Sequence, residues 1–96
     1  MSKINIQQET DGKRGAFFIE EGAKRIAEMI YVMAEPKKMI IEHTEVEESM
    51  RDQGLGLKLL YELVDFARDQ KISVVPECSY AEVMFQKNEE LRDVLS

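Results

Sequence analysis

The sequence is poor in the residues that form disulfides and metal centres. Its 96 residues include one cysteine, Cys78, one histidine, His43, two prolines and no tryptophan. A single cysteine excludes an intramolecular disulfide and a zinc site built from several cysteines. A single histidine excludes a histidine-rich cluster in the same way, so we predict no metal site.

Long apolar runs and an excess of basic residues are also absent. Charged residues interrupt every apolar stretch, which excludes a membrane span of about 20 residues. Residues 1–8 lack the apolar core of a signal peptide, so we expect a cytoplasmic protein. The 13 Lys and Arg and 19 Asp and Glu give a net charge of −6, which argues against nucleic acid as the main partner. An acidic surface instead attracts amines or basic peptides.

The residues that are present fit a globular domain. Hydrophobic residues make up 44% of the chain and charged residues 33%, a balance typical of folded rather than disordered proteins. We expect one domain over residues 1–96, because this length supports a single core. The sequence leaves the oligomeric state open.

The first half of the chain predicts four β-strands. Apolar and polar residues alternate over residues 3–9, and apolar runs follow at 16–20, 23–34 and 39–46. Glycine-containing turns and Pro36 separate these runs. A helix over residues 23–33 is the competing interpretation of the third run. In the fourth run, strict alternation places Ile41, His43 and Glu45 on one face and Ile40, Glu42, Thr44 and Val46 on the other.

The second half predicts a long helix, a short strand and two shorter helices. Apolar residues spaced by three and four mark the long helix, which ends at about residue 70: Gly56, Leu59, Leu60, Leu63, Val64 and Ala67. Residues 72–75 are an apolar strand that a helical crossover should place parallel to the fourth strand. Ser79 and Glu82 fit a capping box that starts the next helix, and residues 88–95 form the last one. These elements predict an α/β fold with a mixed, largely antiparallel sheet.

A loop with two glycines, Arg51-Asp52-Gln53-Gly54-Leu55-Gly56, joins the fourth strand to the long helix. Backbone amides can approach an anion closely where glycines lack side chains, and the helix N-terminus adds partial positive charge. Arg51 adds a full charge beside them, so the pattern predicts a phosphate site. The alternative is a simple turn in which Gly56 is small because it packs against the sheet, since short glycine motifs also arise by chance.

The order β-β-β-β-α-β-α with an R-x-x-G-x-G loop resembles the GCN5-related N-acetyltransferases, most closely their small single-domain branch. Three segments carry this similarity: I-I-E-H-T-E-V at 40–46, R-D-Q-G-L-G-L-K-L-L at 51–60 and V-V-P-E-C-S-Y-A at 74–81. The resemblance implies a bulge in the fourth strand, and fourth and fifth strands that splay apart around acetyl-CoA. It implies transfer of an acetyl group to an amine, either a small amine or a protein lysine or N-terminus.

The resemblance also implies a role for each site residue. The loop would bind the pyrophosphate of coenzyme A through Arg51, Gln53, Gly54, Leu55 and Gly56, with Lys58 beside them. The backbone of the fourth strand would hold the acetyl carbonyl and the pantetheine arm at Thr44, Glu45 and Val46. Tyr80 would line that channel or protonate the leaving thiolate.

The small branch carries a histidine on the fourth strand and a cysteine after the fifth, as His43 and Cys78 stand here. Family members show Cys-Pro-aromatic where this chain has Cys78-Ser79-Tyr80, so the surroundings of Cys78 follow the family less closely.

Two mechanisms use these residues. Acetyl transfer needs a deprotonated amine and a stabilised leaving thiolate. In the first mechanism the amine attacks acetyl-CoA directly, His43 acts as base and Cys78 is auxiliary. In the second, Cys78 is favoured as a thiolate by the adjacent helix N-terminus, takes the acetyl group and passes it on. Two other functions stay open: a non-catalytic module that binds CoA or acyl-CoA, and a structural domain without a ligand.

Overall fold

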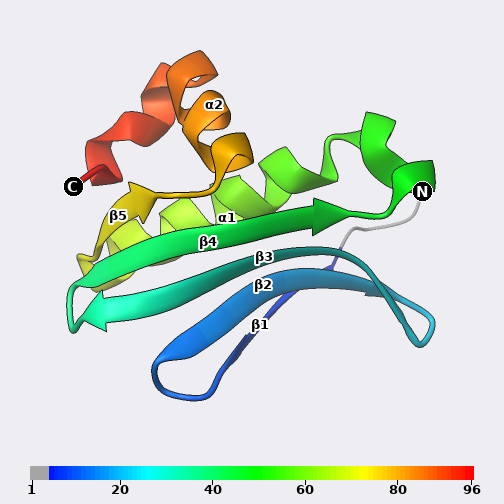
Figure 1. Cartoon of the computed structure of the whole chain (residues 1–96), viewed down its shortest axis with the longest axis horizontal. Helices are drawn as coiled ribbons and strands as arrows, with labels where there is room; N and C mark the ends of the chain where they lie inside the picture. Colours follow the sequence, from blue (N-terminus) through cyan, green and yellow to red (C-terminus); the bar gives the residue numbers. More distant parts are fainter. Residues whose placement is uncertain (1–4) are drawn as a thin grey trace.

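The computed structural model describes residues 5–96, which form a five-stranded sheet covered on one side by helices (Figure 1). The strands are β1 (Ile6–Thr10), β2 (Arg14–Glu21), β3 (Lys24–Glu35), β4 (Lys38–Val46) and β5 (Ser73–Pro76). The helices are the 3-10 helix η1 (Glu48–Gln53), α1 (Leu55–Gln70), α2 (Ser79–Lys87) and the 3-10 helix η2 (Glu89–Val94). The predicted start of the first strand at residue 3 lies outside the described residues. The α/β class is confirmed, and the helical interpretation of residues 23–33 is wrong, because β3 pairs with a strand on each side.

The sheet keeps the order of the chain, β1-β2-β3-β4-β5. The first three pairings are antiparallel and the last, between β4 and β5, is parallel, as predicted. This parallel pairing begins at Lys38 with Ser73 and ends at Ile41 with Pro76. Beyond Ile41 the chain leaves β5 for α2, so among residues 5–96 no strand pairs with this side of the second half of β4, which we call the free edge of β4 (Figure 1).

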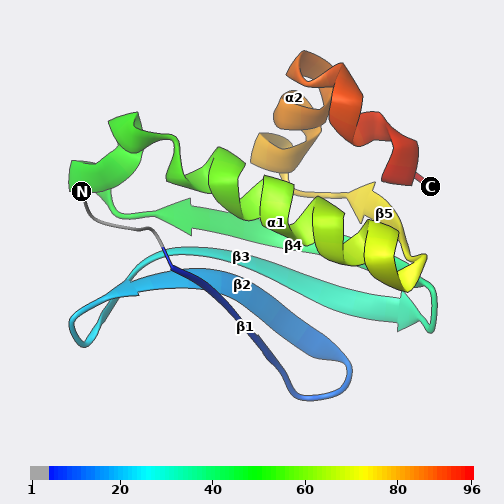
Figure 2. The same ribbon diagram turned by 180° about the vertical axis from the view of Figure 1, so that it is seen from behind.

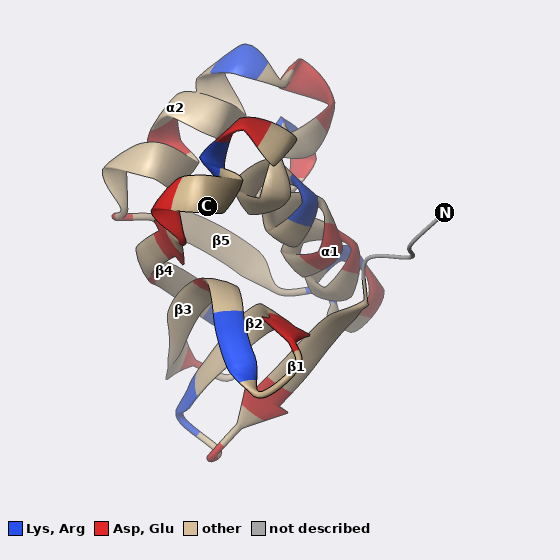
Figure 3. Ribbon diagram, turned by 90° about the vertical axis from the view of Figure 1, so that its right-hand side faces the viewer, with Lys and Arg blue, Asp and Glu red and all other residues tan. Residues whose placement is uncertain are grey.

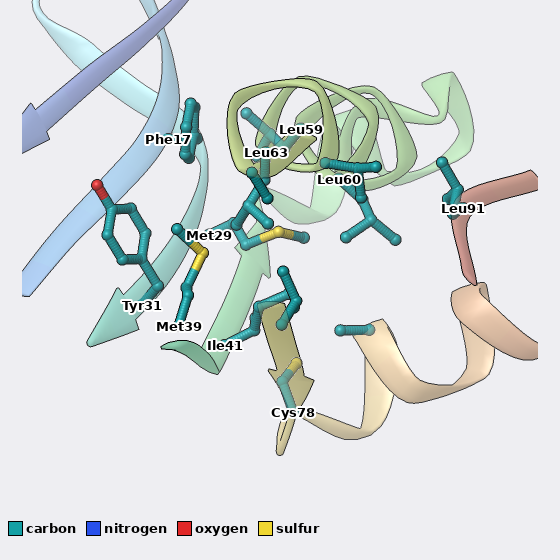
Figure 4. Close-up of a cluster of buried hydrophobic side chains, with 14 of the residues drawn as sticks. Phe17, Met29, Tyr31, Met39, Ile41, Leu59, Leu60, Leu63, Cys78 and Leu91 are labelled. Atoms are coloured by element: carbon teal, nitrogen blue, oxygen red, sulfur yellow. The ribbon is translucent and has the colours of Figure 1, made fainter. Parts of the chain in front are cut away.

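Helix α1 lies across one face of the sheet and buries the predicted apolar stripe (Figure 2). The fully buried members are Leu59, Leu60, Leu63, Val64 and Ala67. They share a core cluster with Met29, Met39 and Ile41 from the sheet (Figure 4). Charged side chains on the opposite side of α1 are exposed, as the spacing predicts. Within residues 5–96, no helix combines the length and the apolar character needed to cross a membrane.

A bulge interrupts the pairing of β3 with β4. Ile30 pairs with His43, but the next residue, Tyr31, pairs with Ile41, so Glu42 is an extra residue on β4. The family resemblance implies a bulge in this strand, and the structure places it just before residues 44–46.

The bulge reverses the alternation of side chains in the second half of β4. Thr44 pairs with Met29, whose side chain is fully buried in the core, so Thr44 faces the helix side of the sheet. His43 and Glu45 therefore face the opposite, solvent side. The prediction that Ile41 shares a face with His43 and Glu45 is wrong, because strict alternation ignores the inserted residue.

The start of α2 also differs from the prediction. Ser79 is the first residue of α2 rather than its N-cap, and Cys78 takes the cap position without a side-chain cap bond. The amides of Glu77 and Cys78 both donate to the Ile41 carbonyl, at 3.0 Å each. These two bonds fix where the chain leaves β5, so that α2 begins at Ser79 itself and not after it, as a capping box at Ser79 would require. The last predicted helix, over residues 88–95, is the shorter 3-10 helix η2.

Candidate cofactor site

A cavity of about 360 Å³ opens where the free edge of β4 meets η1 and the first turns of α1 and α2. Its wall is formed by Thr44, Glu45, Val46, Arg51, Gly54, Gly56 and Tyr80. The fold thus brings three separate segments of the chain to one space. Each of these residues was singled out from the sequence, and their roles stay predictions.

Gly54 forms the sharp turn between η1 and α1. Its φ of 67° lies in the left-handed region, which glycine adopts without steric cost. The first hydrogen bond of α1 runs from the Lys58 amide to the Gly54 carbonyl, at 3.1 Å. The amides of residues 55–57 therefore precede the hydrogen-bond ladder of the helix and have no carbonyl partner within α1, the arrangement that anion sites at helix N-termini use.

Gly56 is needed for a different reason, which is its contact with Tyr80. A Cβ atom at Gly56 would lie 2.6 Å from the Tyr80 hydroxyl oxygen and 2.7 Å from the ring carbon Cζ. A side chain at this position would have to move the ring, so the tight neighbour of Gly56 belongs to α2 and not to the sheet. Burial raises the pKa of Tyr80, and the neighbouring Cys78 raises it further. The phenol therefore keeps its proton at neutral pH.

Arg51 is an exposed cation on the cavity wall, and its Nε donates to the last carbonyl of β4 at 3.3 Å. Three other predicted site residues do not line the cavity with their side chains. Leu55 is buried in the core, and Lys58 is exposed on α1. The Gln53 Nε2 instead contacts the Met50 sulfur at 3.7 Å. For Leu55 only the backbone amide can take part in anion binding.

Cys78 lies beside the cavity, on the helix side of β4. Its thiol donates to the Thr44 hydroxyl at 3.3 Å, and the residue is only 8% exposed. Figure 4 shows Cys78 close to Ile41, where α2 begins. The sulfur is therefore held at the boundary between the core and the cavity.

His43 lies on the solvent face of β4, and among residues 5–96 no hydrogen bond joins it to Cys78. Its side chain is 54% exposed, and its Nε2 lies 3.7 Å from the Glu45 carboxylate. Glu28 of β3 completes a group whose potential ligand atoms lie within 4.8 Å of one another. Sequence analysis missed Glu28, because its place opposite Glu45 depends on the strand register. The two predicted catalytic residues are thus divided between the two faces of β4.

Residues 16–94 match the protein family described as GCN5-related N-acetyl-transferase. A GCN5-like protein from Staphylococcus aureus, solved in solution by NMR, is 30% identical and superposes with a TM-score of 0.78 over 100% of this chain and 91% of its own. A GNAT family acetyltransferase from Elizabethkingia anophelis, with acetyl-CoA bound, is 16% identical over 88% of this chain and 73% of its own, with a TM-score of 0.69. A ribosomal-protein-alanine N-acetyltransferase from Brucella melitensis is 17% identical over 80% of this chain and 62% of its own, with a TM-score of 0.66. No curated protein sequence matches the chain.

The chain belongs to the GCN5-related N-acetyltransferase family. The family match spans β4, the glycine loop, α1, β5 and α2, which are the elements around the cavity. The two structures of lower identity share the fold. The resemblance drawn from the sequence is therefore confirmed for the family and the fold.

Proposed function

We propose that this protein is an N-acetyltransferase that uses acetyl-CoA and acts as a single domain. Family membership supports acetyl transfer in general. One observation carries the proposal for this chain: the free edge of β4, Arg51 and both glycines of the loop line the same cavity. This combination offers an extended backbone and an anion site side by side, which is what a long cofactor with a diphosphate requires.

The groups present fit coenzyme A. A diphosphate needs positive charge and hydrogen-bond donors, which Arg51 and the amides of residues 55–57 provide. The open edge at residues 44–46 can hydrogen-bond to an extended amide-containing arm, as edge strands do to peptides. When bound, acetyl-CoA supplies the thioester whose acetyl group is transferred. The relative from Elizabethkingia anophelis, solved with acetyl-CoA bound, supports this choice of cofactor.

We place the acceptor amine on the solvent face of β4, where His43 would take the proton of the attacking amine. The Glu45 carboxylate, 3.7 Å from Nε2, would orient the imidazole. Direct transfer is favoured over an acetyl-Cys78 route because the thiol's hydrogen-bond partner among the described residues is a hydroxyl, not a general base. Cys78 is then auxiliary to the reaction.

A screen of small amines and lysine peptides for release of free CoA tests the function. We expect turnover with an amine acceptor, and a loss of about 10²–10⁴-fold in His43→Ala, because a general base contributes this much. Full turnover by His43→Ala would take the base role away from His43.

Cys78→Ala separates the two mechanisms in the same assay. Direct transfer predicts that this variant still turns over. The acetyl-Cys78 route predicts no turnover, and in the wild-type protein an adduct of about 42 Da on Cys78 that an amine removes. Binding of CoA without release for any amine would support the alternative of a non-catalytic CoA-binding module.

A further inference from the structure

Within residues 5–96, the Cys78 thiol has one side-chain hydrogen-bond partner, the Thr44 hydroxyl at 3.3 Å. The cysteine is 8% exposed and belongs to the apolar core cluster that also contains Ile41 and Ala81. A cysteine buried among apolar groups is ordinarily inert, because thiolate formation is unfavourable there. The hydrogen bond to the Thr44 hydroxyl is the feature that distinguishes Cys78 from a cysteine that only fills space in the core.

Two independent features of the backbone bring Thr44 and Cys78 together. The amide of Cys78 is bound to the Ile41 carbonyl, which fixes the cysteine at the end of the β4–β5 pairing. The extra residue Glu42 turns Thr44 to the same side of β4. Without the bulge, regular alternation from Ile41 would direct Thr44 to the solvent face. The contact therefore depends on the bulge and not on the local sequence around either residue.

We propose that Thr44 is a positioning residue for Cys78, holding the sulfur beside the cavity and hydrogen-bonding to it in both protonation states. A hydroxyl can accept from the thiol and, after rotation, donate to the thiolate. The bond to the charged thiolate is the stronger of the two, so the hydroxyl should favour its formation. This inference rests on the proposed function for its purpose, in which Cys78 is an auxiliary residue beside the cavity. Its test does not need turnover.

Other titratable groups lie around the sulfur and stay in place when Thr44 is changed. Tyr80 and Glu82 are in the first turns of α2, and Glu77 precedes the cysteine. Arg51 of η1 shares the cavity wall with Thr44 and Tyr80. On β4, His43 and Glu45 face the opposite side of the sheet. Helix α1 contributes apolar residues to the cluster that contains Cys78. A change in the thiol titration on removal of one hydroxyl is therefore attributable to Thr44.

The test follows the ¹³Cβ resonance of Cys78 against pH, which is unambiguous because the chain has one cysteine. We expect the midpoint of the Cys78 titration in Thr44→Ser to equal that of the wild type. In Thr44→Val the midpoint should lie about one pH unit higher, because the thiolate loses a hydrogen bond. Thr44→Ala, which also lacks the oxygen, should show the same direction. Thr10→Val, on the distant β1, is the matched control and should leave the midpoint unchanged.

A second measurement is the rate of alkylation by iodoacetamide at pH 8, detected by mass spectrometry. The rate should fall about tenfold in Thr44→Val and stay near the wild-type value in Thr44→Ser, since only the thiolate reacts. Equal midpoints and rates in wild type and Thr44→Val, or a Thr44→Ser variant that behaves like Thr44→Val, would overturn the proposal. A protein that passes this test and releases no CoA with any amine would refute the proposed function alone.

Discussion

Arg51 is the cation on the wall of a cavity in a protein whose net charge is −6. Glu45 lines the same cavity, and Glu47 follows directly after β4. Figure 3 shows acidic and basic segments interspersed over the sheet and the helices. In the proposed function, Arg51 and the backbone amides of the loop would therefore hold an anionic cofactor against the repulsion of the net negative charge.

Replacing this cation should have a large effect on cofactor binding. We expect Arg51→Glu to weaken CoA binding by about ten- to a hundredfold, because it removes a charge-assisted hydrogen bond and adds repulsion. Isothermal titration calorimetry at constant ionic strength measures the change. Lys87→Glu makes the same charge change at the last residue of α2 and should bind CoA normally. An Arg51→Glu protein with wild-type affinity would remove Arg51 from the site.

At the scale of elements, the Tyr80 ring joins the first turns of α1 and α2 through its contact with Gly56. A glycine inside a helix costs about 1 kcal/mol relative to alanine. The chain keeps this glycine where the ring occupies the space of a Cβ atom. Gly56 thus lowers the stability of α1 but leaves room for the Tyr80 ring beside the cavity.

This coupling can be measured as a double-mutant cycle in urea unfolding. In a Tyr80→Ala background, Gly56→Ala should stabilise the protein by about 1 kcal/mol, because only the helix propensity changes. With Tyr80 present, overpacking should cancel or reverse that gain, so the two values should differ by at least about 1 kcal/mol. Gly54→Ala is the control: its left-handed φ of 67° and empty surroundings predict the same destabilisation in both backgrounds. Identical values for Gly56→Ala in both backgrounds would contradict the contact.

The helices and strands were predicted from the sequence because local patterns and chain order define them, whereas the cap of α2 and the side-chain faces of β4 were not, because contacts with distant residues define these. The spacing of apolar residues predicts α1, and the helical crossover predicts the parallel pairing of β5. The N-cap of α2 was predicted at Ser79, but the Ile41 carbonyl holds the chain so that Cys78 takes that position. No local pattern encodes this bond.

The residues of the site were predicted in large part, but their arrangement in space was not. The loop spacing indicates Arg51, Gly54 and Gly56, and the family resemblance adds Thr44, Val46 and Tyr80; all of these line the cavity. Gln53, Leu55 and Lys58 were predicted with them and do not line it. That His43 and Cys78 lie on opposite faces was not predicted, since it depends on the extra residue Glu42. The Tyr80 contact with Gly56 also needs the packing of two helices and has no signal in the sequence.

For the whole molecule, cofactor binding should be coupled to folding, because the cavity exists only when three segments come together. A ligand at a hundred times its Kd adds about 2.7 kcal/mol to the free energy of unfolding. For a domain of this size, each kcal/mol raises Tm by about 4–8 °C. Thermal unfolding with millimolar CoA should therefore show a clear upward shift, smaller in Arg51→Glu. No shift in the wild-type protein would support a structural domain without a ligand.

Beyond Ile41, one side of β4 has no neighbouring strand in the part of the chain that the structure describes. Such an edge can pair with the same edge of a second molecule and begin aggregation. Glu42 and Glu45 are exposed along this stretch, and Glu47 lies at its end. Glu42 pairs with Arg14 at 2.9 Å and Glu47 with Lys24 at 3.0 Å, so Glu45 is the carboxylate of the three that has no Lys or Arg partner among the described residues. Two copies aligned edge to edge would bring their Glu45 carboxylates near each other, and the repulsion would be strongest at low salt. We therefore expect the charge at Glu45 to disfavour pairing of this edge with a second molecule, which would leave the gap in the sheet open to the proposed cofactor.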